Sequence, residues 1–160
     1  MKIIDCIKRV FSDRIVFCTL GALVKHVSGS DKQMYADDWV IREEVISSLC
    51  AYAPNSVYVV CNYDEIPLGY ITEREAKDTC VNVCSIIARE TNAFVDYLFC
   101  ETLLSNPMRM PYTGMVDFFV NRDEIRTDDV ILIGETQDAK ECALLRGVKY
   151  YDVSEIGELL

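Results

Sequence analysis

The sequence predicts a three-layer α/β fold, in which helices cover both faces of a parallel sheet. Short apolar, β-branched runs alternate along the chain with segments whose apolar residues recur every three or four positions. Alternation of strands with helices is typical of parallel sheets, and strands that are apolar throughout are expected where both faces are buried. The chain shows no internal repeat, so we interpret residues 1–160 as one domain with a core at about 14–156.

The expected elements follow from these patterns. Strands are predicted at 14–20, 57–61, 94–100, 130–133 and 148–151. Helices are predicted at 2–10, about 39–52, 72–90, 113–121 and 138–146, with a short one after residue 154. The segment 22–38 between the first strand and the next helix is interpreted as an insert, because it is polar over much of its length.

Two helix ends carry explicit sequence signals. Thr72 is followed three positions later by Glu75, which is the capping-box pattern, so a helix should begin directly after Thr72. Gly147 follows a helical stripe and is expected to end that helix in the left-handed conformation.

Composition excludes several classes of protein. Apolar residues make up 51% of the chain and the formal net charge is −10, which fits a folded domain and neither a disordered nor a fibrous one. Uncharged apolar runs such as 57–61 are too short to cross a bilayer, so no membrane association is expected. The negative charge is unfavourable for phosphate backbones, and we expect no nucleic-acid partner.

The chain has eight cysteines, which we interpret as buried thiols, since most fall on apolar strands or helix stripes and none forms a CxxC pair. They are Cys6, Cys18, Cys50, Cys61, Cys80, Cys84, Cys100 and Cys142. The single histidine, His26, is expected to face solvent and leaves few ligands for a metal site. Free thiols predict a reducing, cytoplasmic compartment.

Ligands of parallel sheets bind beyond the carboxyl ends of the strands, so the residues to examine lie there. Four segments at these ends resemble, in order, the motifs of the haloacid dehalogenase (HAD) superfamily of phosphatases, especially its polynucleotide 3'-phosphatase branch. The first is 16–23 (VFCTLGAL), which is similar to F-D-x-D-G-T-L, and the second is 59–69 (VVCNYDEIPLG), which is similar to V-x-T-N-Q-x-x-I-x-x-G. The third is 109–115 (RMPYTGM), which is similar to R-K-P-x-T-G-M. The fourth is 131–138 (ILIGETQD), which is similar to an apolar strand followed by G-D-x-x-x-D. The resemblance implies a three-layer Rossmann-like, HAD-like fold.

The departures from these motifs fall on the residues that carry the family's chemistry. Where the family has its aspartate nucleophile and its general acid, this chain has Cys18 and Leu20. Cys61 stands for the phosphate-binding threonine, Met110 for the lysine and Glu135 for the metal-binding aspartate. Phosphoryl transfer depends on positioning and charge stabilisation, so we expect a catalytically inactive protein with no catalytic residue and no cofactor.

The resemblance also names the residues expected around the ligand pocket. They are Cys18, Thr19, Cys61, Asn62, Arg109, Glu135 and Asp138. No metal site is expected among them, although Glu135 and Asp138 are weak candidates for magnesium. Acidic residues after a strand also suit the first turn of a helix, where the helix dipole stabilises them.

Three alternatives stay open at this point. The chain could be an active HAD-like phosphatase of the polynucleotide 3'-phosphatase type with altered chemistry, which requires an ordered cation such as Mg²⁺ or a reactive thiol at Cys18, Glu135 and Asp138. Cys18 and Cys61 could instead pair as a disulfide. A nucleic-acid end-binding module would require a local basic surface, for which the net charge of −10 is unfavourable but not decisive. The favoured reading is an inactive binding or structural module with a protein partner or a second copy of itself. The sequence does not distinguish a protein that works alone from a component of a larger assembly or virus particle.

Overall fold

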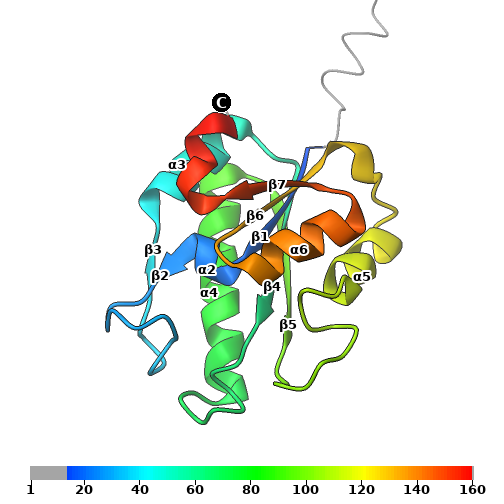
Figure 1. The fold of residues 1–160 in the computed structure, drawn as a ribbon. Coiled ribbons are helices and arrows are strands. Elements are labelled where there is room, and N and C mark those ends of the chain that lie inside the picture. The colour runs from blue at the N-terminus through cyan, green and yellow to red at the C-terminus, as the bar shows by residue number, and fades with distance from the viewer. Residues whose placement is uncertain (1–13, 160) are drawn as a thin grey trace, which may run out of the picture.

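The computed structural model describes residues 14–159 and contains a five-stranded sheet with helices on both faces (Figure 1). The expected helix over 2–10 lies outside the described residues. All neighbouring strands of the sheet are parallel, in the order β5-β4-β1-β6-β7. The strands are β1 (Ile15–Thr19), β4 (Ser56–Asn62), β5 (Phe94–Cys100), β6 (Val130–Gly134) and β7 (Lys149–Asp152). The predicted fold class and all five predicted strands are therefore confirmed.

Helices form the two outer layers. On one face lie α3 (Glu43–Tyr52) and α4 (Glu73–Thr91), and on the other lie α5 (Gly114–Arg122) and α6 (Gln137–Arg146), as Figure 1 shows on either side of the sheet. A 3₁₀ segment, η2 (Val153–Leu159), follows β7. None of the helices in the described part of the chain has the length and apolar character needed to cross a membrane.

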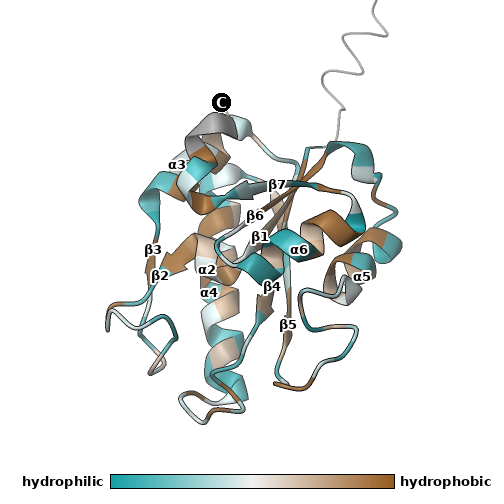
Figure 2. Cartoon of the chain, in the orientation of Figure 1, coloured by the Kyte–Doolittle hydropathy of each residue, from teal (hydrophilic) through white to brown (hydrophobic). Residues whose placement is uncertain are grey.

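The central strand β1 separates two apolar clusters. All five of its residues are buried, and successive side chains point to opposite faces, as the pleat of a strand requires. Val16 and Cys18 contact the cluster under α3 and α4, whereas Phe17 contacts the cluster under α5 and α6. Phe17 stacks on Tyr58 of β4 with ring centroids 5.1 Å apart. Figure 2 shows the apolar colouring along β6, the other neighbour of β1.

The start of the second predicted helix is wrong. The structure places α3 at Glu43 rather than at residue 39, because Val40 and Ile41 form the short strand β3 (Val40–Ile41), which pairs antiparallel with β2 (Val24–Lys25). The amide of Arg42 also donates to the carbonyl of Leu23, 2.8 Å away. These backbone bonds close the base of the insert, so the residues before Glu43 are not available to a helix.

The end of the first strand also differs from the prediction. The first strand ends at Thr19, one residue before its expected end, and Leu20 begins a single helical turn, α2 (Leu20–Leu23). The hydroxyl of Thr19 accepts a hydrogen bond from the amide of Ala22 at 3.3 Å and so caps this turn.

Both predicted helix ends are confirmed. The hydroxyl of Thr72 accepts from the amide of Glu75 at 3.1 Å, and the Glu75 carboxylate accepts from the amide of Thr72 at 2.9 Å, which completes the capping box at the start of α4. Gly147 ends α6 at a φ of +78°, in the left-handed region that favours glycine.

The interpretation of the cysteines needs one correction. Cys18, Cys80, Cys84, Cys100 and Cys142 are buried and Cys61 is partly buried, but Cys50 is exposed. Cys50 lies near the end of α3, away from the buried stripe of that helix, and its Sγ donates to the carbonyl of Glu90 at 3.3 Å. Cys6 lies outside the described residues.

Replacing Thr72 with alanine should lower the free energy of unfolding by about 1 kcal/mol, because the amide of Glu75 loses its acceptor. Chemical denaturation followed by circular dichroism measures this change. Ser85→Ala is the matched control, since Ser85 is exposed in the middle of α4 and alanine favours helix. Equal losses in the two variants would show that the capping box does not stabilise α4.

Candidate functional site

A pocket of about 180 Å³ lies at the carboxyl ends of the strands, where the predicted ligand residues were expected. Residues from the turn after β1, the loop after β4, the loop after β5 and the start of α6 line it. Six of the residues predicted from the motifs are in the lining: Thr19, Cys61, Asn62, Arg109, Glu135 and Asp138. Leu20 and Met110, which replace the general acid and the lysine of the resembled motifs, also line it.

Cys18 is the predicted pocket residue that does not line the pocket. Its side chain has no exposed surface and contacts the apolar cluster between the sheet and helices α3 and α4. Burial raises the pKa of the Cys18 thiol far above its ordinary value, and the nearby Cys84 adds to this shift. The thiol is therefore protonated at neutral pH, whereas a cysteine nucleophile must be a thiolate.

The floor of the pocket is apolar. Leu20 and Met110 are 6% and 5% exposed. The side-chain amide of Asn62 holds Met110 in place: its Oδ1 accepts from the Met110 amide at 2.9 Å and its Nδ2 donates to the Met110 carbonyl at 3.0 Å. Asn62 therefore uses its amide to connect two loops, and Met110 fills the space beside it.

The thiol of Cys61 lies in the pocket wall, and burial raises its pKa well above the ordinary value. Cys18 and Cys61 are both free thiols in the structure. Neither side chain offers an oxygen ligand or a positive charge to the pocket.

Glu135 is the pocket carboxylate closest to the turn after β1. Its Oε2 accepts a hydrogen bond from the Thr19 hydroxyl at 3.2 Å. The carboxylate also packs against Gly21, where an added Cβ would lie 2.1 Å from Oε1. Although the residue as a whole is exposed, desolvation of the carboxylate raises the pKa of Glu135 above its ordinary value of 4.5.

Arg109 is held by an acidic partner at the pocket mouth. Its guanidinium donates two hydrogen bonds to Asp64, at 2.5 and 3.1 Å, and a third to the carbonyl of Thr102 at 3.0 Å. The Nζ of Lys32 lies 3.9 Å from the same carboxylate. The two cationic side chains of the lining thus share Asp64, and this pairing raises the pKa of Arg109.

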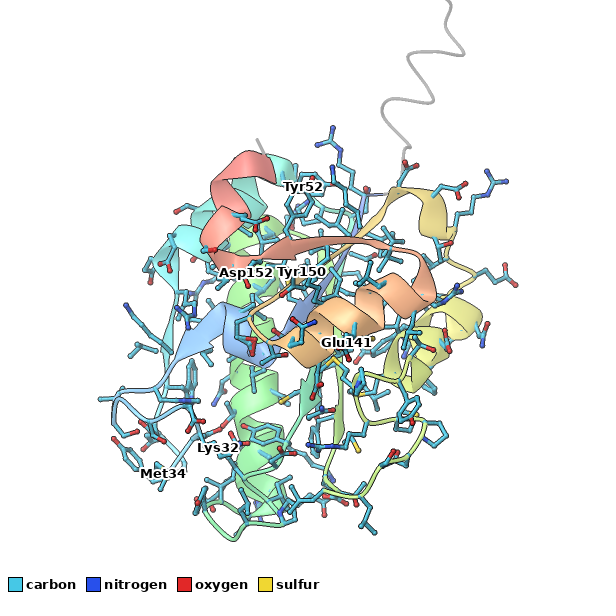
Figure 3. The ribbon with its side chains drawn as sticks, viewed as in Figure 1. Lys32, Met34, Tyr52, Glu141, Tyr150 and Asp152 are labelled. Carbon is cyan, nitrogen blue, oxygen red and sulfur yellow. The ribbon has the colours of Figure 1, made fainter. Side chains whose placement is uncertain are left out.

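The motifs did not point to the part of the pocket that the insert builds. His26, Asp31 and Lys32 line the pocket from this segment, and Lys32 is labelled in Figure 3. The expectation that His26 faces solvent is only partly met, because its side chain is half-buried at the pocket and its Nδ1 lies 3.0 Å from the Ser30 carbonyl. A polar stretch of sequence gives no signal for such a role.

A buried polar network fixes the insert to the body of the protein. Gln33 is 2% exposed. Its backbone amide donates to Glu65 Oε2 at 3.1 Å, and its side-chain Nε2 donates to the Thr79 hydroxyl at 3.0 Å. The hydroxyl of Tyr63 donates to Oε1 of the same side chain. The insert is therefore a fixed wall of the pocket.

Several solved structures have a similar fold. The chain is 20% identical to a protein from Mesorhizobium loti described as a HAD-like phosphatase, with a TM-score of 0.74 over 92% of this chain and 84% of the other. It is 14% identical to the D,D-heptose 1,7-bisphosphate phosphatase of B. bronchiseptica, solved with magnesium and phosphate, with a TM-score of 0.72 over 86% of this chain and 78% of that one.

A protein of unstated function from Listeria monocytogenes serotype 4b matches with 16% identity and a TM-score of 0.56 over 86% of this chain and 76% of that one. No protein-family model and no curated protein sequence matches the chain. The fold is that of the HAD-like phosphatases, as the motifs predicted.

The residues of the pocket do not fit the magnesium ion that this fold class implies. Magnesium prefers a compact octahedral set of carboxylate and water oxygens. Cys18 in β1 and Leu20 directly after that strand have no side-chain oxygen, and the carboxylate of Glu135 is hydrogen-bonded to Thr19. Within residues 14–159, no three histidine, cysteine or acidic side chains are arranged to hold a metal ion.

Gly21→Ala should push the Glu135 carboxylate aside, break its bond to Thr19 and lower the free energy of unfolding by about 1 kcal/mol. In a Glu135→Ala background, the same substitution should be neutral or slightly stabilising, since the clash is gone and alanine favours the helical turn. Chemical denaturation of the four proteins measures this coupling. An equal cost in both backgrounds would contradict the described contact.

Iodoacetamide should modify Cys18 of the native protein at least about 100 times more slowly than the exposed Cys50, because the Cys18 thiol is buried and protonated. Peptide mass spectrometry at successive times measures both rates in one sample. In guanidinium chloride the two rates should become similar. Rapid modification of Cys18 in the folded protein would mean that its thiol reaches solvent as a thiolate.

Proposed function

We propose that this protein is a catalytically inactive member of the HAD-like phosphatase fold class, a pseudo-phosphatase that acts as a binding or assembly module. The observation that carries the proposal is the burial of Cys18. The position of the family's nucleophile holds a thiol that has no exposed surface, lies outside the pocket and is protonated.

The other pocket residues support the same conclusion. Leu20 cannot transfer a proton to a leaving group, and Met110 cannot balance the charge of a phosphoryl group. Arg109, the one guanidinium in the lining, is already paired with Asp64. Loss of a single stabilising donor costs roughly 100- to 1,000-fold in comparable sites, so these replacements together remove the basis for turnover.

What the chain keeps is the scaffold and a pocket of fixed shape. The parallel sheet, the turn at Gly21 and the polar network around Gln33 are complete without a reactive group. Such a scaffold suits recognition of a protein partner or of a second copy. A reducing, cytoplasmic compartment, with or without a larger assembly, stays a prediction from the cysteines.

The purified chain should not hydrolyse p-nitrophenyl phosphate or a 3'-phosphorylated oligonucleotide above the level of a Cys18→Ala variant, with or without magnesium. An active HAD-fold phosphatase assayed in parallel shows that the substrates and the metal are competent. Circular dichroism of both chains shows that they are folded.

Magnesium-dependent turnover that is lost in Cys18→Ala would overturn the proposal and favour the alternative, an active phosphatase with altered chemistry. Turnover that survives in Cys18→Ala but is lost in Glu135→Gln would also overturn it, because the pocket would then be catalytic without the thiol.

A further inference from the structure

The loops that line the pocket also carry exposed apolar side chains. These loops are the insert, the loop after β4 and the loop after β5, and Figure 1 shows all three in the lower half of the molecule. We call the following residues the apolar rim: Val27 (60% exposed), Leu68 (41%), Tyr70 (41%), Leu103 (47%) and Leu104 (77%).

Each part of the apolar rim is connected to a pocket residue. Val27 follows the lining residue His26 directly. The amide of Leu68 donates to the carbonyl of Asp64 at 3.1 Å, and the amide of Tyr70 donates to that of Glu65 at 3.0 Å. Leu103 and Leu104 follow Thr102, whose carbonyl accepts from Arg109. The exposed apolar side chains are therefore carried by the same loops that line the pocket.

The pocket itself carries an excess of negative charge. Its lining includes five carboxylates and two cationic side chains, and both cations lie around Asp64. Within residues 14–159, the other carboxylates of the lining form no salt bridge; they are Asp31, Glu65, Glu135 and Asp138. Asp138 also offsets the positive end of the α6 dipole, so that helix end does not attract anions.

We propose that this surface binds a segment of a partner protein that inserts a lysine or arginine side chain into the pocket and lays neighbouring apolar residues on the apolar rim. This inference rests on the proposed function, because it assigns a partner to the same pocket. A phosphate group would meet carboxylates that have no cationic partner there, with Arg109 already engaged. A cationic side chain meets complementary charge, and the net charge of −10 attracts it from a distance.

The size of the pocket agrees with a single side chain. Its volume of about 180 Å³ is below the roughly 300 Å³ at which pockets begin to take drug-sized ligands. The apolar rim supplies the further contact area that a partner segment needs.

The test uses the full chain and three peptides with the sequences SLVRVLS, SLVQVLS and SLVEVLS, each acetylated and amidated. Chemical-shift changes of the ¹⁵N-labelled protein give the affinities. The arginine peptide should bind at least about 10-fold more tightly than the glutamate peptide, with changes at Glu135, Asp138 and the apolar rim. The glutamine peptide should fall between them.

Two matched pairs of variants locate the site. The double variant Glu135→Gln/Asp138→Asn should weaken binding of the arginine peptide about 10-fold. Its control, Asp128→Asn/Asp129→Asn, removes the same charge before β6, at the opposite end of the sheet, and should change the affinity less than about 2-fold. Leu104→Ser should weaken binding, whereas Leu144→Ser, 68% exposed on α6, should not.

Equal affinity for the three peptides, or equal effects of the two double variants, would overturn the inference. Changes at the pocket with inorganic phosphate and none with the arginine peptide would overturn it as well, since the pocket would then be an anion site. If the chain shows neither phosphatase activity nor peptide binding, this partner is rejected and the proposed function is retained. Phosphatase turnover rejects the proposed function itself.

Discussion

The burial of β1 between two apolar clusters is the constraint on which the rest of the structure depends. Its alternating side chains contact helices on both faces, while its backbone pairs with β4 and β6 along its length. Because the strands are parallel, this pairing brings their carboxyl ends to one edge and so determines where a pocket can form. The same alternation directs Cys18 into the core and Thr19 toward the pocket.

The strands could be predicted because each is a compact apolar run with turn residues beside it, and the helix starting after Thr72 could be predicted from its cap. The two-residue strands β2 and β3 could not, since pairing so short leaves no periodic pattern in sequence. For the same reason the start of α3 was misplaced. Local patterns determine long elements, whereas a short ladder depends on which distant segments meet.

Most of the pocket was also predictable, because the motif positions follow strand ends whose placement the topology determines. The contribution of the insert was not. Lys32 and Asp31 lie at the pocket beside Gln33, which bonds to residues far along the chain, and a buried glutamine looks like any polar loop residue in sequence. The pairing of Arg109 with Asp64 likewise depends on contacts between two loops. The balance of charge in the pocket could therefore be established only from the structure.

The apolar floor formed by Leu20 and Met110 bears on the balance between stability and activity. A working active site at this edge of a sheet gathers charged groups that repel one another and resist desolvation, and proteins tolerate that loss of stability in exchange for catalysis. Here the same positions add buried apolar surface to the fold. Substitutions that replace these pocket residues with a charged, phosphatase-like set would therefore lower the free energy of unfolding of the whole domain.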